Sequence, residues 1–87
     1  MKTSTIARRT GENCYEFSGR VEIEKINELF DIGLPESDEY MTIAGYILYH
    51  YKTIPKPGET IEIENYKFEI LKGNRTKIEL VKMKIEN

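Results

Sequence analysis

The sequence lacks tryptophan, and it contains one cysteine (Cys14) and one histidine (His50). A single cysteine cannot form an internal disulfide, so nothing in the chain requires an oxidising compartment. The longest apolar run, Ile43 to Tyr49, is too short to cross a bilayer, and the first residues lack the apolar core of a signal peptide. We therefore expect a segment that is soluble when isolated and does not itself insert into a membrane.

The charges are nearly balanced and spread along the chain. The chain contains 15 acidic and 13 basic residues, so its net charge is −2. The basic residues do not form a stripe of the kind that nucleic-acid binding needs. One histidine, one cysteine and scattered carboxylates provide no recognisable pairing of nucleophile and base. At 87 residues, 39% hydrophobic and 32% charged, the chain is typical of one globular domain. We predict neither an enzyme nor a nucleic-acid-binding protein.

Hydrophobic periodicity predicts a strand pair followed by a helix. Residues 4–9 and 14–17 flank a turn signal at 10–13 and are expected to form a hairpin. From Glu22 to Phe30, apolar residues recur at spacings of three and four, which indicates a short amphipathic helix. Gly33, followed closely by a proline, is expected to end it.

A second, more apolar helix is predicted from about Ile43 to Tyr51, with Thr42 as its N-cap. Ile43, Ile47 and Tyr51 are expected to share its buried stripe. The two prolines of residues 54–58 then force a corner.

Alternating patterns predict three further strands. Residues 61–63 and 66–70 read as a hairpin around Glu64-Asn65, where asparagine would tolerate the left-handed turn geometry. A last strand from about Lys77 to Ile85 changes its apolar phase midway, which predicts either a β-bulge or a change of partner sheet. The expected fold class is α+β, a small two-layer domain of order β-β-α-α-β-β-β with a mainly antiparallel sheet and two helices.

Two polar segments are candidate ligand sites. Gly19 and Arg20 precede a helix and are candidates for binding the phosphate of a cofactor, although a structural turn in which Arg20 pairs with a carboxylate is favoured. Glu36, Asp38 and Glu39 offer oxygen atoms to a hard cation, but three carboxylates on one loop without regular ligand spacing are more often solvated. We predict no metal site.

Three tyrosines, Tyr46, Tyr49 and Tyr51, crowd the second predicted helix and cannot all share its buried stripe. At least one is expected to face a rim or a partner, because tyrosine combines apolar area with a polar tip. These residues are the interaction candidates, and a core edge with satisfied hydroxyls is the alternative.

Six short segments resemble one known family in the same order along the chain. They are Ser18-Gly19-Arg20, Asn27-Glu28-Leu29, Leu34-Pro35-Glu36, Thr42-Ile43-Ala44-Gly45, Ile54-Pro55-Lys56-Pro57-Gly58-Glu59 and Tyr66-Lys67-Phe68-Glu69-Ile70. Together they resemble the transporter-associated domain of the CorC/HlyC family, the C-terminal domain of CBS-domain-containing haemolysin-like and magnesium and cobalt efflux proteins. The chain departs from that pattern at Ala44, Asn65 and Val21, and Val21 weakens the expected start of the first helix.

The resemblance implies a context rather than a chemistry. Residues 1–87 would be a single domain, excised from the C-terminus of a longer membrane protein and lying on the cytoplasmic side of the cell membrane. Its partners would be a CBS-domain pair, the membrane domain of the parent protein, or a second copy in a homodimer. It would act as a non-catalytic regulatory domain. The implied fold is similar to a flavoenzyme subdomain, the FAD-binding/transporter-associated domain-like fold, so the alternative is a sensor that binds adenine nucleotide or FAD.

Overall fold

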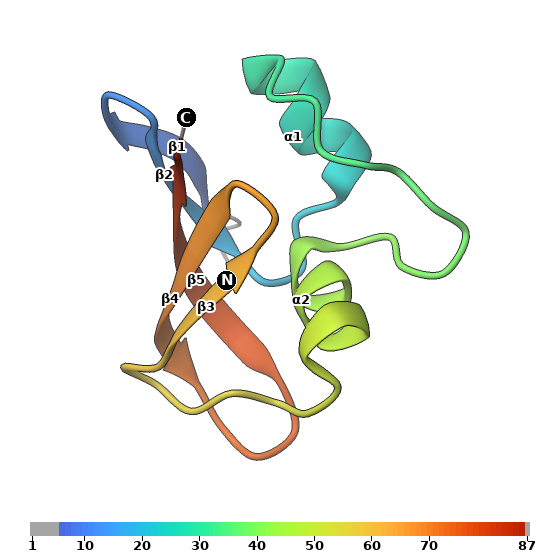
Figure 1. Ribbon diagram of the computed structural model, residues 1–87, viewed down its shortest axis with the longest axis vertical. Helices are drawn as coiled ribbons and strands as arrows, with labels where there is room; N and C mark the ends of the chain where they lie inside the picture. The colour runs from blue at the N-terminus through green and yellow to red at the C-terminus, as the bar shows by residue number, and fades with distance from the viewer. Residues whose placement is uncertain (1–5, 87) are drawn as a thin grey trace, which may run out of the picture.

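A computed structural model describes residues 6–86 and contains five strands and two helices (Figure 1). In chain order these are β1 (Ala7–Gly11), β2 (Cys14–Ser18), α1 (Ile23–Phe30), α2 (Ile43–Tyr51), β3 (Thr60–Ile63), β4 (Tyr66–Gly73) and β5 (Ile78–Ile85). This order confirms the predicted fold class. The first predicted strand included residues 4 and 5, which lie outside the described residues. None of the helices within residues 6–86 has the length and apolar character needed to cross a membrane.

The five strands form one antiparallel sheet in the order β1-β2-β5-β4-β3. Strand β5, the last in the chain, therefore lies at the centre, between the N-terminal hairpin β1–β2 and the later hairpin β3–β4. Both helices belong to the connection between β2 and β3, and Figure 1 shows them on the same side of the sheet. The molecule is thus a two-layer α+β sandwich.

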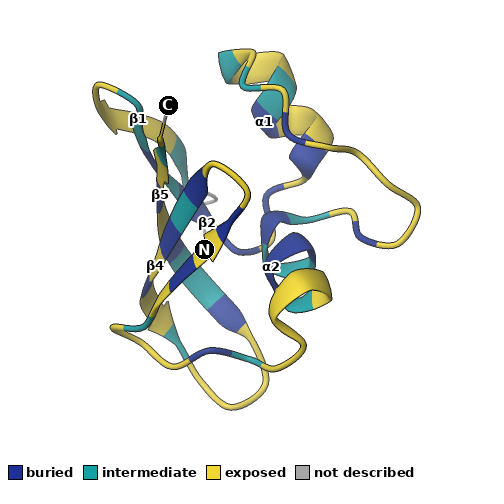
Figure 2. Ribbon diagram, in the orientation of Figure 1, coloured by how far each residue is buried: buried dark blue, intermediate teal, exposed yellow. Residues whose placement is uncertain are grey.

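The core lies between the sheet and the two helices (Figure 2). On the N-terminal side, the ring of Phe30 from α1 packs against Tyr15 and Phe17 of β2, with centroid separations of 5.1 and 6.0 Å. On the other side, Tyr46 of α2 packs edge-on against Phe68 of β4, with centroids 6.0 Å apart. Each fully buried phenylalanine among them, Phe17 and Phe68, stabilises the fold by about 1.5–3 kcal/mol relative to exposure. Alternate residues of the inner strands thus anchor both helices.

The predicted bulge lies where β4 meets β5. Ile70 pairs with Val81, but the next pair is Lys72 with Leu80, so Leu71 has no partner on β5. One extra residue on β4 moves Lys72 into line with Leu80, because side chains alternate between the two faces of a strand. The bulge therefore places Lys72, rather than Leu71, opposite Leu80, which pairs on its other side with Ser18 at the end of β2.

The two helices begin differently, as the sequence predicts. The hydroxyl of Thr42 accepts a hydrogen bond from the backbone N–H of Gly45 at 3.1 Å and caps α2. At the start of α1, the cap residue Glu22 makes no side-chain cap hydrogen bond. This absence agrees with the weak start expected from Val21.

Two turn positions differ from the sequence prediction. Helix α1 ends at Asp31, which has a left-handed φ of 55° and donates its N–H to the carbonyl of Asn27, before Gly33 is reached. In the β3–β4 turn the left-handed residue is Glu64, with a φ of 55°, rather than Asn65. Residues with a Cβ thus adopt strained backbone here, because the hydrogen bonds around them outweigh the local preference.

The buried stripe of α2 also differs from the prediction. Ile43, Tyr46 and Ile47 are fully buried, whereas Tyr51 is 37% exposed. Tyr46 lies three residues after Ile43 and so falls on the same side of the helix. Tyr51 is the last helical residue, and its hydroxyl donates to the carboxylate of Glu59 in the corner instead.

Candidate functional site

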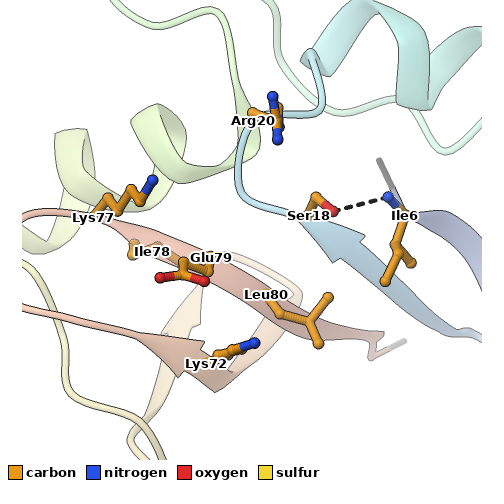
Figure 3. Close-up of a pocket in the computed structure, with 8 residues that line it drawn as sticks. All are labelled: Ile6, Ser18, Arg20, Lys72, Lys77, Ile78, Glu79 and Leu80. Carbon is orange, nitrogen blue, oxygen red and sulfur yellow. Dashed lines mark hydrogen bonds between the residues drawn. The ribbon is translucent and has the colours of Figure 1, made fainter. Parts of the chain in front are cut away.

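A pocket of about 520 Å³ opens beside Arg20, at the end of the β2–β5–β4 part of the sheet (Figure 3). It is built from four segments of the chain: the residue before β1, the end of β2 with the following turn, the end of β4, and the start of β5. The residues that line it are Ile6, Ser18, Arg20, Lys72, Lys77, Ile78, Glu79 and Leu80. The pocket thus contains one of the two residues that the sequence nominated for phosphate binding.

Backbone hydrogen bonds fix the turn that carries Arg20. The N–H of Val21 donates to the carbonyl of Ser18 at 3.0 Å, and the N–H of Gly19 donates to the carbonyl of Glu79 at 2.9 Å. The hydroxyl of the buried Ser18 accepts from the N–H of Ile6 at 2.8 Å. These bonds tie the turn to β1 and β5 and leave the side chain of Arg20 exposed at the pocket rim.

Gly19 has a structural role in this turn rather than the predicted ligand role. A Cβ at this position would lie 2.0 Å from the carbonyl oxygen of Ile78, so only glycine lets the two backbones approach. Its N–H already donates to Glu79, and an incoming phosphate would not find this amide free. The prediction that Gly19 contributes to an anion site is therefore corrected, and Arg20 remains the candidate.

Three cationic side chains dominate the electrostatics of the pocket. Arg20, Lys72 and Lys77 are all exposed, and none lies within 4.0 Å of a carboxylate oxygen in residues 6–86. The ion pair that the sequence analysis favoured for Arg20 is therefore not formed. Glu79 is the one carboxylate among the described lining residues, which gives the lining a net charge of +2. Such a site can hold an anion, and its lining offers no histidine or cysteine for catalysis.

Sequence reasoning missed two of the three cations. Lys72 was not considered, and Lys77 was only expected to begin a strand. Both reach the pocket because β4 and β5 pair with a bulge beside the end of β2. The available signal was the presence of two lysines near the predicted bulge. Their distance from Arg20 could not be predicted, because it depends on the pairing of strands that are far apart in the sequence.

The predicted acidic loop does not form a converging ligand set. Glu36, Asp38 and Glu39 are exposed, and a carboxylate oxygen of Glu36 accepts from the side-chain amide of Asn27 at 3.1 Å. Glu36 lines a small pocket of about 90 Å³ to which Asp38 and Glu39 do not contribute; its lining is Glu22, Ile23, Glu24, Glu36, Ser37, Tyr40 and Met41. Among residues 6–86, no three His, Cys, Asp or Glu side chains are placed to hold a metal ion.

Tyr46 is buried completely, so its side chain cannot contact a partner as the sequence analysis proposed. Its ring packs edge-on against Tyr40 and His50, with centroids 5.1 and 4.9 Å away. Its hydroxyl has no hydrogen-bond partner among the described residues. Burial, with a smaller contribution from Glu64, raises the pKa of the Tyr46 phenol well above its ordinary value. Tyr46 is a core residue with an unsatisfied polar atom.

The other two tyrosines lie at the surface, at the C-terminal end of α2. Tyr49 is 41% exposed and its ring packs against Tyr40 and His50. The ammonium group of Lys52 lies over the same ring, 5.0 Å from its centroid. Tyr51 and the neighbouring His50 are exposed as well. We call Tyr49, His50 and Tyr51 the aromatic end of α2. It is the part of the tyrosine cluster that a partner can reach.

Comparison with known proteins gives a consistent result. The model of the CorC_HlyC family, described as a transporter associated domain, matches residues 8–87. The chain is 30% identical over 71 residues to the polyamine export protein of Haemophilus influenzae, a match that covers 80% of this chain and 16% of that relative. The chain therefore spans only a small part of the curated relatives it matches.

Solved structures share the fold. A hemolysin domain from Enterococcus faecalis V583 superposes with a TM-score of 0.76 at 28% identity, covering 94% of this chain and 99% of that chain. The transporter associated domain from a CBS domain protein of Porphyromonas gingivalis gives a TM-score of 0.76 at 23% identity and covers 93% of this chain and 98% of that chain. The second likeness bears on the fold alone.

Proposed function

Because the chain belongs to the CorC/HlyC family of transporter-associated domains, we propose that it is a non-catalytic regulatory and interaction domain of a CBS-domain-containing ion transporter. The aromatic end of α2 is the observation that supports this proposal, since two tyrosines lie exposed at one helix end. Exposed tyrosines are enriched at protein interfaces, where the ring gives contact area and the hydroxyl stays polar. The domain acts by docking rather than by chemistry.

The partner we propose is the CBS-domain pair of the same parent protein. Its support is that the chain matches only 16% of a curated relative's length and that the sequence resembles the C-terminal domain of CBS-domain-containing proteins. In this arrangement the domain lies on the cytoplasmic side of the membrane, at the C-terminus of the parent. Contact with the membrane domain or with a second copy of the chain is the competing arrangement.

The transported substrate of the parent is proposed to be a cation. The resemblance to magnesium and cobalt efflux proteins and the name of the polyamine export relative share one property, positive charge. The three cations of the Arg20 pocket argue against this pocket binding such a substrate, because like charges repel. In this proposal the effect of the domain on transport passes through its docking partner.

The docking proposal is tested by isothermal titration calorimetry with the CBS-domain pair of the parent transporter. Tyr49→Ala should weaken binding about 30-fold, the loss of roughly 2 kcal/mol typical of an interfacial aromatic anchor. Leu29→Ala is the matched control, because Leu29 is a 50% exposed apolar residue on α1 and away from the aromatic end of α2. If both variants bind like the wild type, or weaken equally, the aromatic end of α2 is not the docking surface.

A ligand sensor is the second candidate, favoured by the pocket beside Arg20. An adenine nucleotide or FAD would place its phosphates among the cations, and binding would raise the melting temperature with ligand concentration. The described lining residues include no aromatic side chain on which an adenine or flavin ring could stack. Thermal unfolding with AMP, ATP and FAD, added separately, tests this candidate, and an unchanged melting temperature with all three rejects it.

A further inference from the structure

We propose that the pocket between Arg20, Lys72 and Lys77 binds the phosphate group of a compact, non-aromatic ligand, either a small phosphate monoester or the headgroup of an anionic phospholipid. This inference goes beyond the proposed docking function. It rests on different residues, which lie at the end of the sheet rather than on α2. Neither a positive nor a negative result of the docking test decides whether this pocket binds phosphate, which has its own experiment.

Three separate segments bring the cations to one pocket. Arg20 comes from the turn after β2, Lys72 from the bulged end of β4, and Lys77 from the residue before β5 (Figure 3). A guanidinium and two ammonium groups offer many N–H donors, and charge-assisted hydrogen bonds to phosphate oxygens are about twice as strong as neutral ones. Nothing in residues 6–86 neutralises these three cations by an ion pair.

The charge of the pocket fits a phosphate monoester. With Glu79 included, the described lining carries a net charge of +2, while a phosphate monoester carries roughly −1.5 to −2 at neutral pH. The Glu79 carboxylate is near the side-chain amide of Asn74, 3.4 Å away, and is not paired with a cation. A phosphate monoester in its dianionic form balances this charge fully, and the phosphodiester of a phospholipid headgroup, with one negative charge, balances half of it.

The apolar part of the lining restricts the class of ligand further. Ile6, Ile78 and Leu80 give aliphatic surface next to the cations. The described lining contains no ring, so recognition of a base or an isoalloxazine by stacking has no support here. A glycerol phosphate unit, with a short aliphatic part beside its phosphate, matches both features, and it occurs in free form and in phospholipid headgroups.

Amide NMR titration of the domain with inorganic phosphate and with glycerol 3-phosphate gives the direct test. We expect saturable shifts confined to Arg20, Lys72 and residues 77–80, with tighter binding of glycerol 3-phosphate. Co-sedimentation with vesicles of phosphatidylglycerol and phosphatidylcholine, compared with phosphatidylcholine alone, distinguishes the two sources. Binding to the anionic vesicles assigns the lipid headgroup, and saturable binding of the soluble monoester alone assigns a free ligand.

A matched pair of double variants separates a site from general attraction to positive charge. Lys72→Gln with Lys77→Gln should weaken binding of glycerol 3-phosphate, or of anionic vesicles, about tenfold or more. Lys25→Gln with Lys84→Gln removes the same charge at exposed positions outside the pocket and should leave binding within about twofold, since exposed charges at that distance are screened by salt. Equal loss in both double variants overturns the proposal, as does the absence of saturable shifts and of vesicle binding in the wild type.

Discussion

Tyr46→Phe is expected to stabilise this domain, although it changes a residue at the centre of the core. The hydroxyl of Tyr46 is buried and has no hydrogen-bond partner within the described residues. A buried polar group without a partner costs about 1–3 kcal/mol in lost hydration. Phenylalanine keeps the ring contacts with Tyr40, His50 and Phe68 and removes only the oxygen.

The expected gain is about 1 kcal/mol in the free energy of unfolding, because part of the relieved cost is offset by the small space that the oxygen leaves. Tyr40→Phe is the matched control. The Tyr40 hydroxyl donates to the carbonyl of Pro35 at 2.9 Å, so its removal should cost about 1 kcal/mol. Urea unfolding of the two variants and the wild type measures these two changes in unfolding free energy, which are expected to have opposite signs. Each kcal/mol corresponds to roughly 4–8 °C in melting temperature.

The pH dependence supplies an independent signature. Burial raises the pKa of the Tyr46 phenol above its ordinary value of 10.0. Below pH 10 the phenol is protonated in both the folded and the unfolded chain, so its titration does not change stability. As the pH rises above 10, the phenol of the unfolded chain releases its proton first, and the folded state loses stability. Tyr46→Phe should therefore lose less stability above pH 10 than the wild type. If Tyr46→Phe is destabilised as much as Tyr40→Phe, the hydroxyl has a partner and the reasoning is refuted.

Three further changes test the fold. Gly19→Ala should destabilise the domain by about 3 kcal/mol in urea unfolding, because the new Cβ meets a carbonyl oxygen at 2.0 Å. Thr42→Ala should cost about 1 kcal/mol and Glu22→Ala much less, since only Thr42 makes a side-chain cap bond; equal losses would contradict this. The hydrogen bond from Tyr51 lowers the pKa of Glu59, so its contribution to stability is complete above the ordinary pKa of a glutamate and is lost as the pH falls through the lowered pKa. Tyr51→Phe should raise the pKa of Glu59 in a carboxyl NMR titration. An unchanged pKa of Glu59 would rule out this hydrogen bond.

Local signals were sufficient to predict the element order. The start of α2 depends on Thr42 and the residues just after it, and the β3–β4 hairpin depends on two alternating runs with two residues between them. In such cases the pattern and the contacts that stabilise it lie within one or two turns of chain. The change of apolar phase in β5 predicted an irregularity in that strand, where Glu79 has no partner on β4, but nothing in the sequence predicted the extra residue Leu71 on β4.

The orientation of individual side chains on α2 was harder to predict. Both Tyr46 and Tyr51 fit an apolar stripe that contains Ile43 and Ile47, and the sequence analysis chose Tyr51. The choice depends on where the sheet lies relative to the end of the helix, which is a property of the packed molecule. Tyr46 packs against Phe68 of β4, whereas Tyr51 is exposed and its hydroxyl donates a hydrogen bond to Glu59.

The composition of the pocket could be predicted only in part. Arg20 was recognised from its place before a helix, but its neighbours Lys72 and Lys77 come from the other end of the chain. Their arrival depends on the pairing of β5 with both β2 and β4, and on the extra residue in β4. Gly19 was predicted as part of a phosphate site, whereas in the structure glycine is required by the close approach of its backbone to Ile78.

We propose above that this transporter-associated domain docks through the aromatic end of α2. An amide NMR titration of the domain with the CBS-domain pair of the parent transporter locates the docking surface residue by residue. We expect saturable shifts centred on Tyr49, His50 and Tyr51 and none at the exposed residues of β1. Shifts that centre elsewhere, or a spectrum unchanged at saturating partner, would contradict the proposal.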